Sequence, residues 1–218
     1  MMAGGSVIVV ATGNAGKVRE FAHAFAAYGK EVASIRDYSG IPDIVEDGDT
    51  FAANARIKAK TVGDALGLPA LADDSGLCVD ALGGAPGVYS ARYAGEGAAD
   101  ADNNAKLLRE LKKAAEAGGI VPEAADGLPS GVRALSTARF VCALAFYDPR
   151  SGAFTESEGT VSGLIIDRPL GEGGFGYDPL FWLPESGLTT AQLSTADKQR
   201  ISHRGRALAL LLKKLGSL

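Results

Sequence analysis

The chain has 218 residues, of which 46% are apolar, and a net charge of −4 at pH 7. This length and composition suffice for one large domain or two lobes with a substantial core. The chain lacks both a run of about 18 apolar residues that could span a bilayer and a basic signal-peptide segment, and its acidic charge argues against binding nucleic-acid polymers. We therefore expect a cytoplasmic protein with no membrane partner and no nucleic-acid polymer as ligand.

The N-terminal part of the chain alternates between strand and helix patterns. Residues 6–11 form an apolar β-branched run typical of a strand, and a Gly-containing loop follows. A helix is predicted next, because apolar residues recur at helical spacing: Val18, Phe21, Ala22 and Phe25. Residues 31–35 predict a second strand, and residues 50–66 predict an Ala-rich helix that Gly67 and Pro69 end. This order is typical of the opening of an α/β fold.

An acidic pair, Asp73-Asp74, stands between two short strand patterns at residues 70–72 and 77–81. We expect the pair to lie in a turn at the end of a buried strand. Two neighbouring carboxylates repel each other, so a chain that places both there is expected to hold a compensating cation. Ligands that are all oxygens favour magnesium.

The C-terminal half predicts a mixed sheet. Residues 104–117 have a helical pattern, whereas residues 118–135 lack periodicity and predict an exposed loop insertion. Strand patterns at residues 139–147 and 154–166 flank a turn sequence, which favours an antiparallel hairpin. The chain closes with an amphipathic helix, whose apolar residues are Ala207, Leu208, Leu211, Leu212 and Leu215.

The segment Thr12–Lys17 lies between the first strand and the first helix. Backbone N–H groups and the helix dipole attract phosphate at such a position, and Lys17 adds charge. The P-loop pattern fails, because only two residues separate Gly13 from Gly16 and Val18 stands where Ser or Thr would hold magnesium. The alternative is an ordinary tight turn with a surface lysine.

A second glycine-rich segment, residues 171–176, matches the dinucleotide-binding pattern in letters only. Pro169 before it and Tyr177-Asp178-Pro179 after it exclude the strand and the helix that the motif requires. Phe175 or Tyr177 could instead stack on a flat base, or both rings could fill the core.

A basic cluster, Ser202-His203-Arg204, precedes the last predicted helix, with Lys198 four residues before Ser202. These donors could recognise a carbonyl oxygen of a base or contact phosphate, or they could form a solvated helix start. Glu46, before the second helix, could complete a magnesium site with the acidic pair, or it could be a solvated loop residue.

Taken together, these motifs resemble the inosine triphosphate pyrophosphatase family, also called Ham1-like or noncanonical purine NTP pyrophosphatases. The resemblance rests on Thr12–Lys17, on residues 72–77 and 83–92, on residues 174–179 and on Ser202–Gly205. It implies a single domain over residues 1–218 with an elongated mixed β-sheet flanked by helices, two lobes with a nucleotide cleft between them, and a homodimer. It also implies Mg²⁺-dependent attack of water on ITP, dITP or XTP. The products would be the monophosphate and pyrophosphate, and the reaction would cleanse the nucleotide pool.

The resemblance also implies a role for individual residues. Those that would bind the triphosphate are Thr12, Gly13, Asn14, Ala15, Gly16, Lys17 and Lys58. Glu46 and Asp74 would hold magnesium, and Asp74 is also the proposed proton acceptor, although Asp73 or Asp74 could orient the water. Eight further residues would contact the rest of the substrate: Ser75, Phe175, Gly176, Tyr177, Asp178, Lys198, His203 and Arg204. Of these, Lys198, His203 and Arg204 would recognise the 6-oxo group of the base.

Two other functions fit parts of this pattern. A nucleotide-binding sensor would need the lysines and the aromatic ring but would gain little from two carboxylates beside an anionic ligand. A pyrophosphatase for pyrimidine nucleotides would share the phosphate chemistry and differ in its base pocket. The acidic pair favours an enzyme, and the resemblance favours purines.

Overall fold

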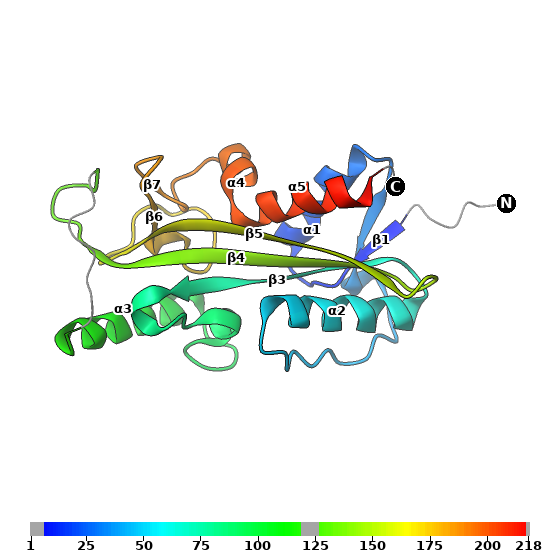
Figure 1. Ribbon diagram of the computed structural model, residues 1–218, viewed down its shortest axis with the longest axis horizontal. Helices are drawn as coiled ribbons and strands as arrows, with labels where there is room; N and C mark the ends of the chain where they lie inside the picture. The colour runs from blue at the N-terminus through cyan, green and yellow to red at the C-terminus, as the bar shows by residue number, and fades with distance from the viewer. Residues whose placement is uncertain (1–6, 119–126, 217–218) are drawn as a thin grey trace. The chain divides into compact units, whose positions relative to one another are not determined.

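The structure, a computed structural model, describes residues 7–118 and 127–216 (Figure 1). Its α-helices are α1 (Ala15–Ala26), α2 (Phe51–Leu66), α3 (Asp100–Glu116), α4 (Thr195–Ile201) and α5 (His203–Leu215). Its strands are β1 (Val7–Val10), β2 (Glu31–Ser34), β3 (Ala70–Val79), β4 (Ala134–Asp148), β5 (Ala153–Ile166), β6 (Phe181–Leu183) and β7 (Leu188–Thr189). None of the helices within these ranges is long and apolar enough to cross a membrane.

The strands form one seven-stranded sheet in the order β2-β1-β3-β4-β5-β6-β7. β1 pairs in parallel with β2 and β3, whereas β6 pairs antiparallel with β5 and β7. β4 and β5 are neighbours joined by four residues, a connection that only antiparallel strands allow. The mixed α/β sheet and the hairpin expected from the sequence are therefore confirmed.

The chain divides into two compact units, and β3, β4 and β5 supply residues to both. Unit 1 holds the residues up to Asp74, Cys142–Gly159 and the residues from Ala207 onward. Unit 2 holds Ser75–Val141 and Thr160–Arg206. Each unit has apolar clusters of its own, so each can be described by itself.

In unit 1, helices cover both faces of the sheet. Phe21 of α1 and Leu211 of α5 pack with Ile8 on one face, while Ala59 of α2 packs with Val9 on the other (Figure 1). Ile8 and Val9 are consecutive residues of β1, and they contribute to different cores because side chains alternate along a strand. The same alternation orders the polar residues of β3.

In unit 2, α3 packs on the sheet through Leu107 and Leu111, which join a cluster with Leu77 and Phe181. Trp182, on β6, points to the other apolar cluster of this unit, with Leu164 and Ile166. Neither β6, β7 nor α4 is predicted from the sequence. They are short, and a short element presents too few residues for a period to be visible.

The acidic pair does not lie in a turn: β3 is one continuous strand from Ala70 to Val79, with Asp73 and Asp74 inside it. The expectation of two strand pieces around a turn is wrong. Aspartate and glycine are rare in strands, and aspartate, serine and glycine are common in turns, so the sequence pattern at these positions predicts a turn. The structure overrides this propensity by giving each buried carboxylate a hydrogen-bond partner.

Other boundaries differ less. α3 begins at Asp100 rather than at residue 104, and α5 begins at His203, so His203 and Arg204 of the basic cluster belong to α5 while Ser202 is the C-cap of α4. β4 begins at Ala134, so the last two residues of the expected 118–135 loop are strand. Residues 119–126 of that loop lie outside the described residues.

Gly63 provides a test of the packing between α2 and β4. A Cβ atom at this position would lie 2.5 Å from Cδ1 of Tyr147. In an exposed helix, Gly→Ala stabilises by about 1 kcal/mol, whereas overpacking a core costs about 1–3 kcal/mol. We predict that Gly63→Ala lowers the free energy of unfolding in urea, and that the loss disappears in a Tyr147→Ala background. A gain in stability in the Tyr147 protein would contradict this packing.

Candidate active site

Asp73 and Asp74 lie on opposite faces of β3, because successive side chains of a strand point in opposite directions. Both are buried, with 3% and 9% of their surface exposed. Lys17 Nζ, from α1, donates to Oδ1 of Asp73 at 2.5 Å, and Lys58 Nζ, from α2, donates to Oδ1 of Asp74 at 2.8 Å. From the sequence we expected one compensating cation for both carboxylates, but in the structure the two carboxylates face different cations. Each has its own lysine, and the two lysines come from different helices.

Asp73 is occupied at both oxygens. Besides the bond from Lys17, its Oδ2 accepts the thiol of Cys142 at 3.3 Å. Lys17 lies in the first turn of α1 and is part-buried, so Asp73 fixes the lysine beside the N-terminus of that helix. In this arrangement Asp73 positions a cation.

The Thr12–Lys17 loop is shaped by Asn14, the N-cap of α1. Asn14 Oδ1 accepts the backbone N–H groups of Gly16 at 2.8 Å and Lys17 at 3.2 Å. Two of the N–H groups that the sequence offers to phosphate are thus bound by the cap, which corrects our expectation that they are free. The attraction for phosphate then depends more on Lys17 and on the helix dipole.

Arg36 is a cation near this loop that the sequence did not single out. A Cβ atom on Gly13 would lie 2.9 Å from Nε of Arg36, so the guanidinium lies against the glycine. The signal that locates it is the parallel register of β1 and β2, in which Val10 is opposite Ser34. Residues just after β2 therefore lie beside the loop that follows β1, and Ser34 Oγ donates to the carbonyl of Thr12 at 3.1 Å.

Asp74, Glu46 and Lys58 form the second part of the site in unit 1. Lys58 Nζ lies 3.0 Å from Oε2 of Glu46 and 2.8 Å from Oδ1 of Asp74, so it bridges the two carboxylates. Burial raises the pKa of Asp74. Lys58 opposes that shift, as does a weaker interaction with the Asn54 side chain, whereas the charge of Glu46 adds to it. Burial also lowers the pKa of Lys58, but Asp74 and Glu46 together outweigh it and leave that pKa raised.

The residues present fit a magnesium ion. Oδ2 of Asp74 is buried and has no hydrogen-bond partner among the described residues, as expected of an oxygen that serves a cation. Within the same described ranges, no three His, Cys, Asp or Glu side chains gather to form a metal site of protein groups alone. One or two carboxylates completed by substrate phosphates are the ligands that Mg²⁺ commonly uses.

The loop with Phe175 is built from unit 2. Phe175 is 51% exposed, and its backbone N–H donates to Oδ2 of Asp178 at 2.9 Å. Lys198 pairs with the same carboxylate, and its Nζ lies 5.1 Å from the centroid of the Phe175 ring. Asp178 is buried and also accepts Thr190 Oγ1 at 2.9 Å, so its carboxylate holds the loop together.

Tyr177 has a different environment from Phe175. It is buried, its hydroxyl donates to the carbonyl of Ser90 at 2.9 Å, and burial raises the pKa of that hydroxyl. Of the two aromatic side chains proposed for base stacking, only Phe175 is exposed enough to meet a ligand. Tyr177 fills the core and anchors the loop.

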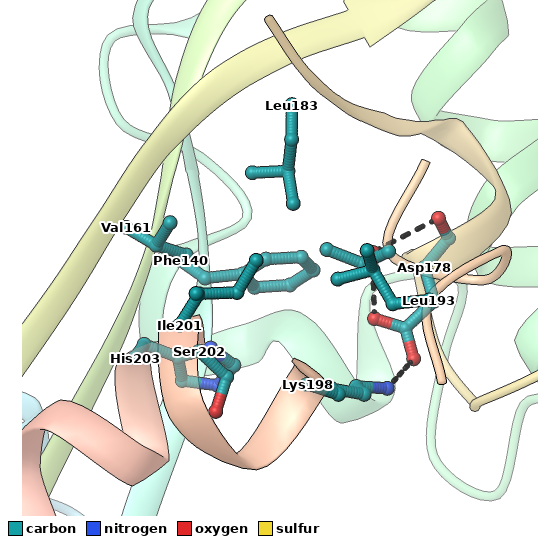
Figure 2. Close-up of a pocket in the computed structure, with 10 residues that line it drawn as sticks. Phe140, Val161, Asp178, Leu183, Leu193, Lys198, Ile201, Ser202 and His203 are labelled. Carbon is teal, nitrogen blue, oxygen red and sulfur yellow. Dashed lines mark hydrogen bonds and ion pairs between the residues drawn. The ribbon is translucent and has the colours of Figure 1, made fainter. Parts of the chain in front are cut away.

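His203 and Arg204 are buried, at 9% and 4% exposure, so the alternative of a solvated helix start is wrong. The His203 ring stacks on Phe140 with centroids 5.0 Å apart and an interplanar angle of 19°. Figure 2 shows a pocket of unit 2 that His203, Lys198 and Asp178 line together with apolar side chains. The ammonium of Lys198 points to Asp178 in this view.

The candidate residues thus form one group in each unit. Unit 1 brings the Thr12–Lys17 loop, Glu46, Lys58 and the acidic pair within its own sheet and helices. Unit 2 brings the Phe175 loop, Lys198 and His203 together. Ser75 follows Asp74 directly in β3 and is part-buried.

Two lysines of α2 provide a test of the buried pairing. Lys58→Met leaves Asp74 buried without its ammonium, so we predict a loss of about 3 kcal/mol in the free energy of unfolding in urea. Lys60→Met removes an exposed pair with Asp64 on the same helix and should change stability far less. Equal losses in the two variants would mean that the Lys58 bridge is no more important than a surface ion pair.

Comparisons with known proteins identify the family of this chain. The model of the Ham1 family matches residues 8–214. A dITP/XTP pyrophosphatase of Geobacillus kaustophilus is 54% identical over 205 residues, which cover 94% of this chain and 91% of the relative. The dITP/XTP pyrophosphatase of Geobacter sulfurreducens is 48% identical, with 96% of each chain covered.

Solved structures give the same result. A HAM1 protein from Coxiella burnetii has a TM-score of 0.82 at 38% identity, covering 96% of this chain and 98% of its own. A nucleoside-triphosphatase / dITP/XTP pyrophosphatase from Mycobacterium abscessus has a TM-score of 0.71 at 39% identity, covering 94% and 98%. Because a family model and close relatives both span nearly the whole sequence, this chain belongs to the Ham1 family.

Proposed function

We propose that this protein hydrolyses the noncanonical purine nucleoside triphosphates ITP, dITP and XTP to the monophosphate and pyrophosphate, with Mg²⁺ as cofactor. The observation that carries the proposal is the arrangement of unit 1. Asp74 is a buried carboxylate that pairs with the bridging Lys58, and its Oδ2 has no hydrogen-bond partner in the part of the chain that the structure describes. The same unit places Lys17 at a helix N-terminus. The names of the Geobacillus and Geobacter relatives support the substrate class.

Lys17 and Lys58 supply the charge for the phosphate chain. Hydrolysis to pyrophosphate concentrates negative charge on the departing group, and positioned cations stabilise that charge more than they stabilise the ground state. Asp73 holds Lys17 in place before substrate arrives, so the lysine needs less reordering when it binds phosphate. The dipole of α1 acts in the same direction.

Asp74 is our candidate for the proton acceptor, and Asp73 is not. Both oxygens of Asp73 accept protein hydrogen bonds, whereas Oδ2 of Asp74 is unpartnered among the described residues. Asp74 and Glu46 would also hold the metal. Bound Mg²⁺ would polarise phosphoryl oxygens and offset the repulsion between the carboxylates and the triphosphate. Because Lys58 fixes Oδ1, Oδ2 is the oxygen of Asp74 that remains for both roles, and these roles compete. An oxygen bound to Mg²⁺ is a poor base, so Oδ2 can accept the proton of the water only while it is not a metal ligand.

The purine would be recognised by groups of unit 2. Phe175 offers an exposed ring for stacking, and Lys198, His203 and Arg204 are the proposed donors to the 6-oxo group. Adenine carries an amino group at that position, which is itself a donor, so it would leave these donors unpaired. A mismatch of this kind can cost about 10⁴-fold in recognition. The family resemblance further leads us to propose a homodimer that acts in the cytoplasm.

Turnover of a nucleotide panel tests the function. The protein with magnesium is given ITP, XTP, dITP, GTP, ATP or dUTP separately, and the phosphate product is identified. We predict pyrophosphate from ITP, XTP and dITP at rates far above those with ATP and dUTP. Release of orthophosphate would exclude the proposed bond cleavage. Equal rates with ATP and ITP would exclude recognition of the 6-oxo group, and tight binding without turnover would indicate a sensor.

Isosteric variants separate the two aspartates. We predict that Asp74→Asn lowers kcat by about 10²–10⁴-fold while nucleotide binding remains measurable, because the proton acceptor is removed. Asp73→Asn should instead raise KM for ITP about tenfold with a smaller change in kcat, because Lys17 loses its charged anchor. Steady-state kinetics on both variants checks the contrast. If the two effects were exchanged, Asp73 would be the acceptor and our assignment wrong.

A further inference from the structure

Two side chains of α3 hold the peptide groups of Gly176, the residue that follows Phe175. The backbone N–H of Gly176 donates to Oδ2 of Asp100 at 2.6 Å. Its carbonyl accepts Nδ2 of Asn104 at 3.0 Å. Asp100 and Asn104 are four residues apart, so they share a face of the first turns of α3. All of these groups belong to unit 2.

Asp100 and Asn104, which we call the Gly176 clamp, fix the backbone on the C-terminal side of Phe175. On the other side, the N–H of Phe175 is bound by Asp178. Gly176 has φ +61°, in the left-handed region where glycine is unstrained, so the loop can turn here without cost from a side chain. The main chain is therefore held at both ends of Phe175 while the ring itself stays half exposed. A ring presented in this way loses little freedom when a flat base stacks on it.

The orientation of Asn104 indicates that the clamp is more than local packing. Because the carbonyl of Gly176 is an acceptor, Asn104 must present its amino group to it. Its own Oδ1 is then buried and has no hydrogen-bond partner among the described residues. An unpaired buried oxygen lowers stability and offsets what the bond to the Gly176 carbonyl contributes, so Asn104 adds little net stability to the fold.

The neighbouring asparagine shows what a structural amide looks like. Asn103 accepts the N–H of Ala94 through Oδ1 at 2.7 Å and donates to the carbonyl of Ala91 at 3.2 Å. Both ends of its amide are satisfied, and the side chain is buried. Asn103 therefore holds a turn with both ends of its amide paired. Asn104 pairs the carbonyl of Gly176, but its own Oδ1 has no partner among the described residues.

We propose that Asp100 and Asn104 are positioning residues that preorganise Phe175 for stacking on the base of the nucleotide. The proposal rests on the proposed function in taking a nucleotide as the ligand of Phe175. The two residues act through the Gly176 peptide and touch neither the phosphates nor the reacting atoms. They should therefore set the affinity for the base and leave the affinity for pyrophosphate unchanged.

Asn104→Leu is the decisive variant, with Asn103→Leu as the structural control. Asn104→Leu removes the bond to the carbonyl of Gly176 but also removes the unpaired Oδ1, so we expect a Tm close to that of the parent. We expect its KM for ITP to rise about fivefold to tenfold and its inhibition constant for pyrophosphate to stay unchanged. Asn103→Leu should lower the Tm clearly, because it removes two hydrogen bonds, to the N–H of Ala94 and to the carbonyl of Ala91, and no unpaired atom is removed in exchange. Asp100→Ala should raise KM as Asn104→Leu does. In a Phe175→Ala background, Asn104→Leu should have no further effect on KM, since the ring that it positions is gone.

A spectroscopic readout keeps the test independent of turnover. Phe175→Trp places an indole at the platform, and its fluorescence anisotropy, after subtraction of the Trp182 signal, reports the mobility of the ring. We expect Asn104→Leu to lower that anisotropy and Asn103→Leu to leave it unchanged. An unchanged anisotropy, a KM for ITP that does not rise, or additive effects of Asn104→Leu and Phe175→Ala would each overturn the proposal. Failure of the parent protein to hydrolyse ITP would overturn the proposed function alone, because the anisotropy would still report the clamp.

Discussion

Alternation of side chains along β3 is the constraint on which the rest of this site depends. Two consecutive aspartates in a strand must point to opposite faces, so each meets a different helix. Burial of a charged carboxylate costs free energy unless a cation pairs with it. α1 and α2 each provide a lysine for this purpose. The two aspartates therefore differ in their contacts. Both oxygens of Asp73 bind groups of the protein, whereas Oδ2 of Asp74 has no hydrogen-bond partner among the described residues and is the atom that we propose for a metal or water. Asp73 and Asp74 are adjacent in the sequence and yet have different partners in the structure.

The residues proposed for base recognition in unit 2 follow a similar principle, because polar side chains fix the backbone around them. Asp178, Asp100 and Asn104 hold the peptides around one exposed ring. Asp178, which the resemblance places among the residues that contact the substrate, binds Phe175, Thr190 and Lys198 through its carboxylate oxygens. In both units, therefore, a buried carboxylate fixes a neighbouring group that we propose as a contact to the ligand: Asp73 fixes Lys17, and Asp178 fixes Phe175.

The sequence predicts the elements that are long and periodic, such as α2, the β4–β5 hairpin and the apolar face of α5. It fails at β3, because strand propensity opposes aspartate while the lysines that make the strand stable come from distant residues. The resemblance identifies Lys17, Lys58 and the Phe175 loop as candidates, yet only the contacts separate Phe175 from the buried Tyr177. Arg36, Asp100 and Asn104 carry no motif of their own. They become visible only through the register of β1 with β2 and the bonds from α3 to Gly176.

The most direct test of the division between the two aspartates is a crystal structure with magnesium and a triphosphate analogue that cannot be hydrolysed. Our account predicts a metal ion bound by the carboxylates of Asp74 and Glu46, with Asp73 still paired to Lys17 on the other face of β3. A metal ion bound by Asp73, or shared between Asp73 and Asp74, would contradict the account.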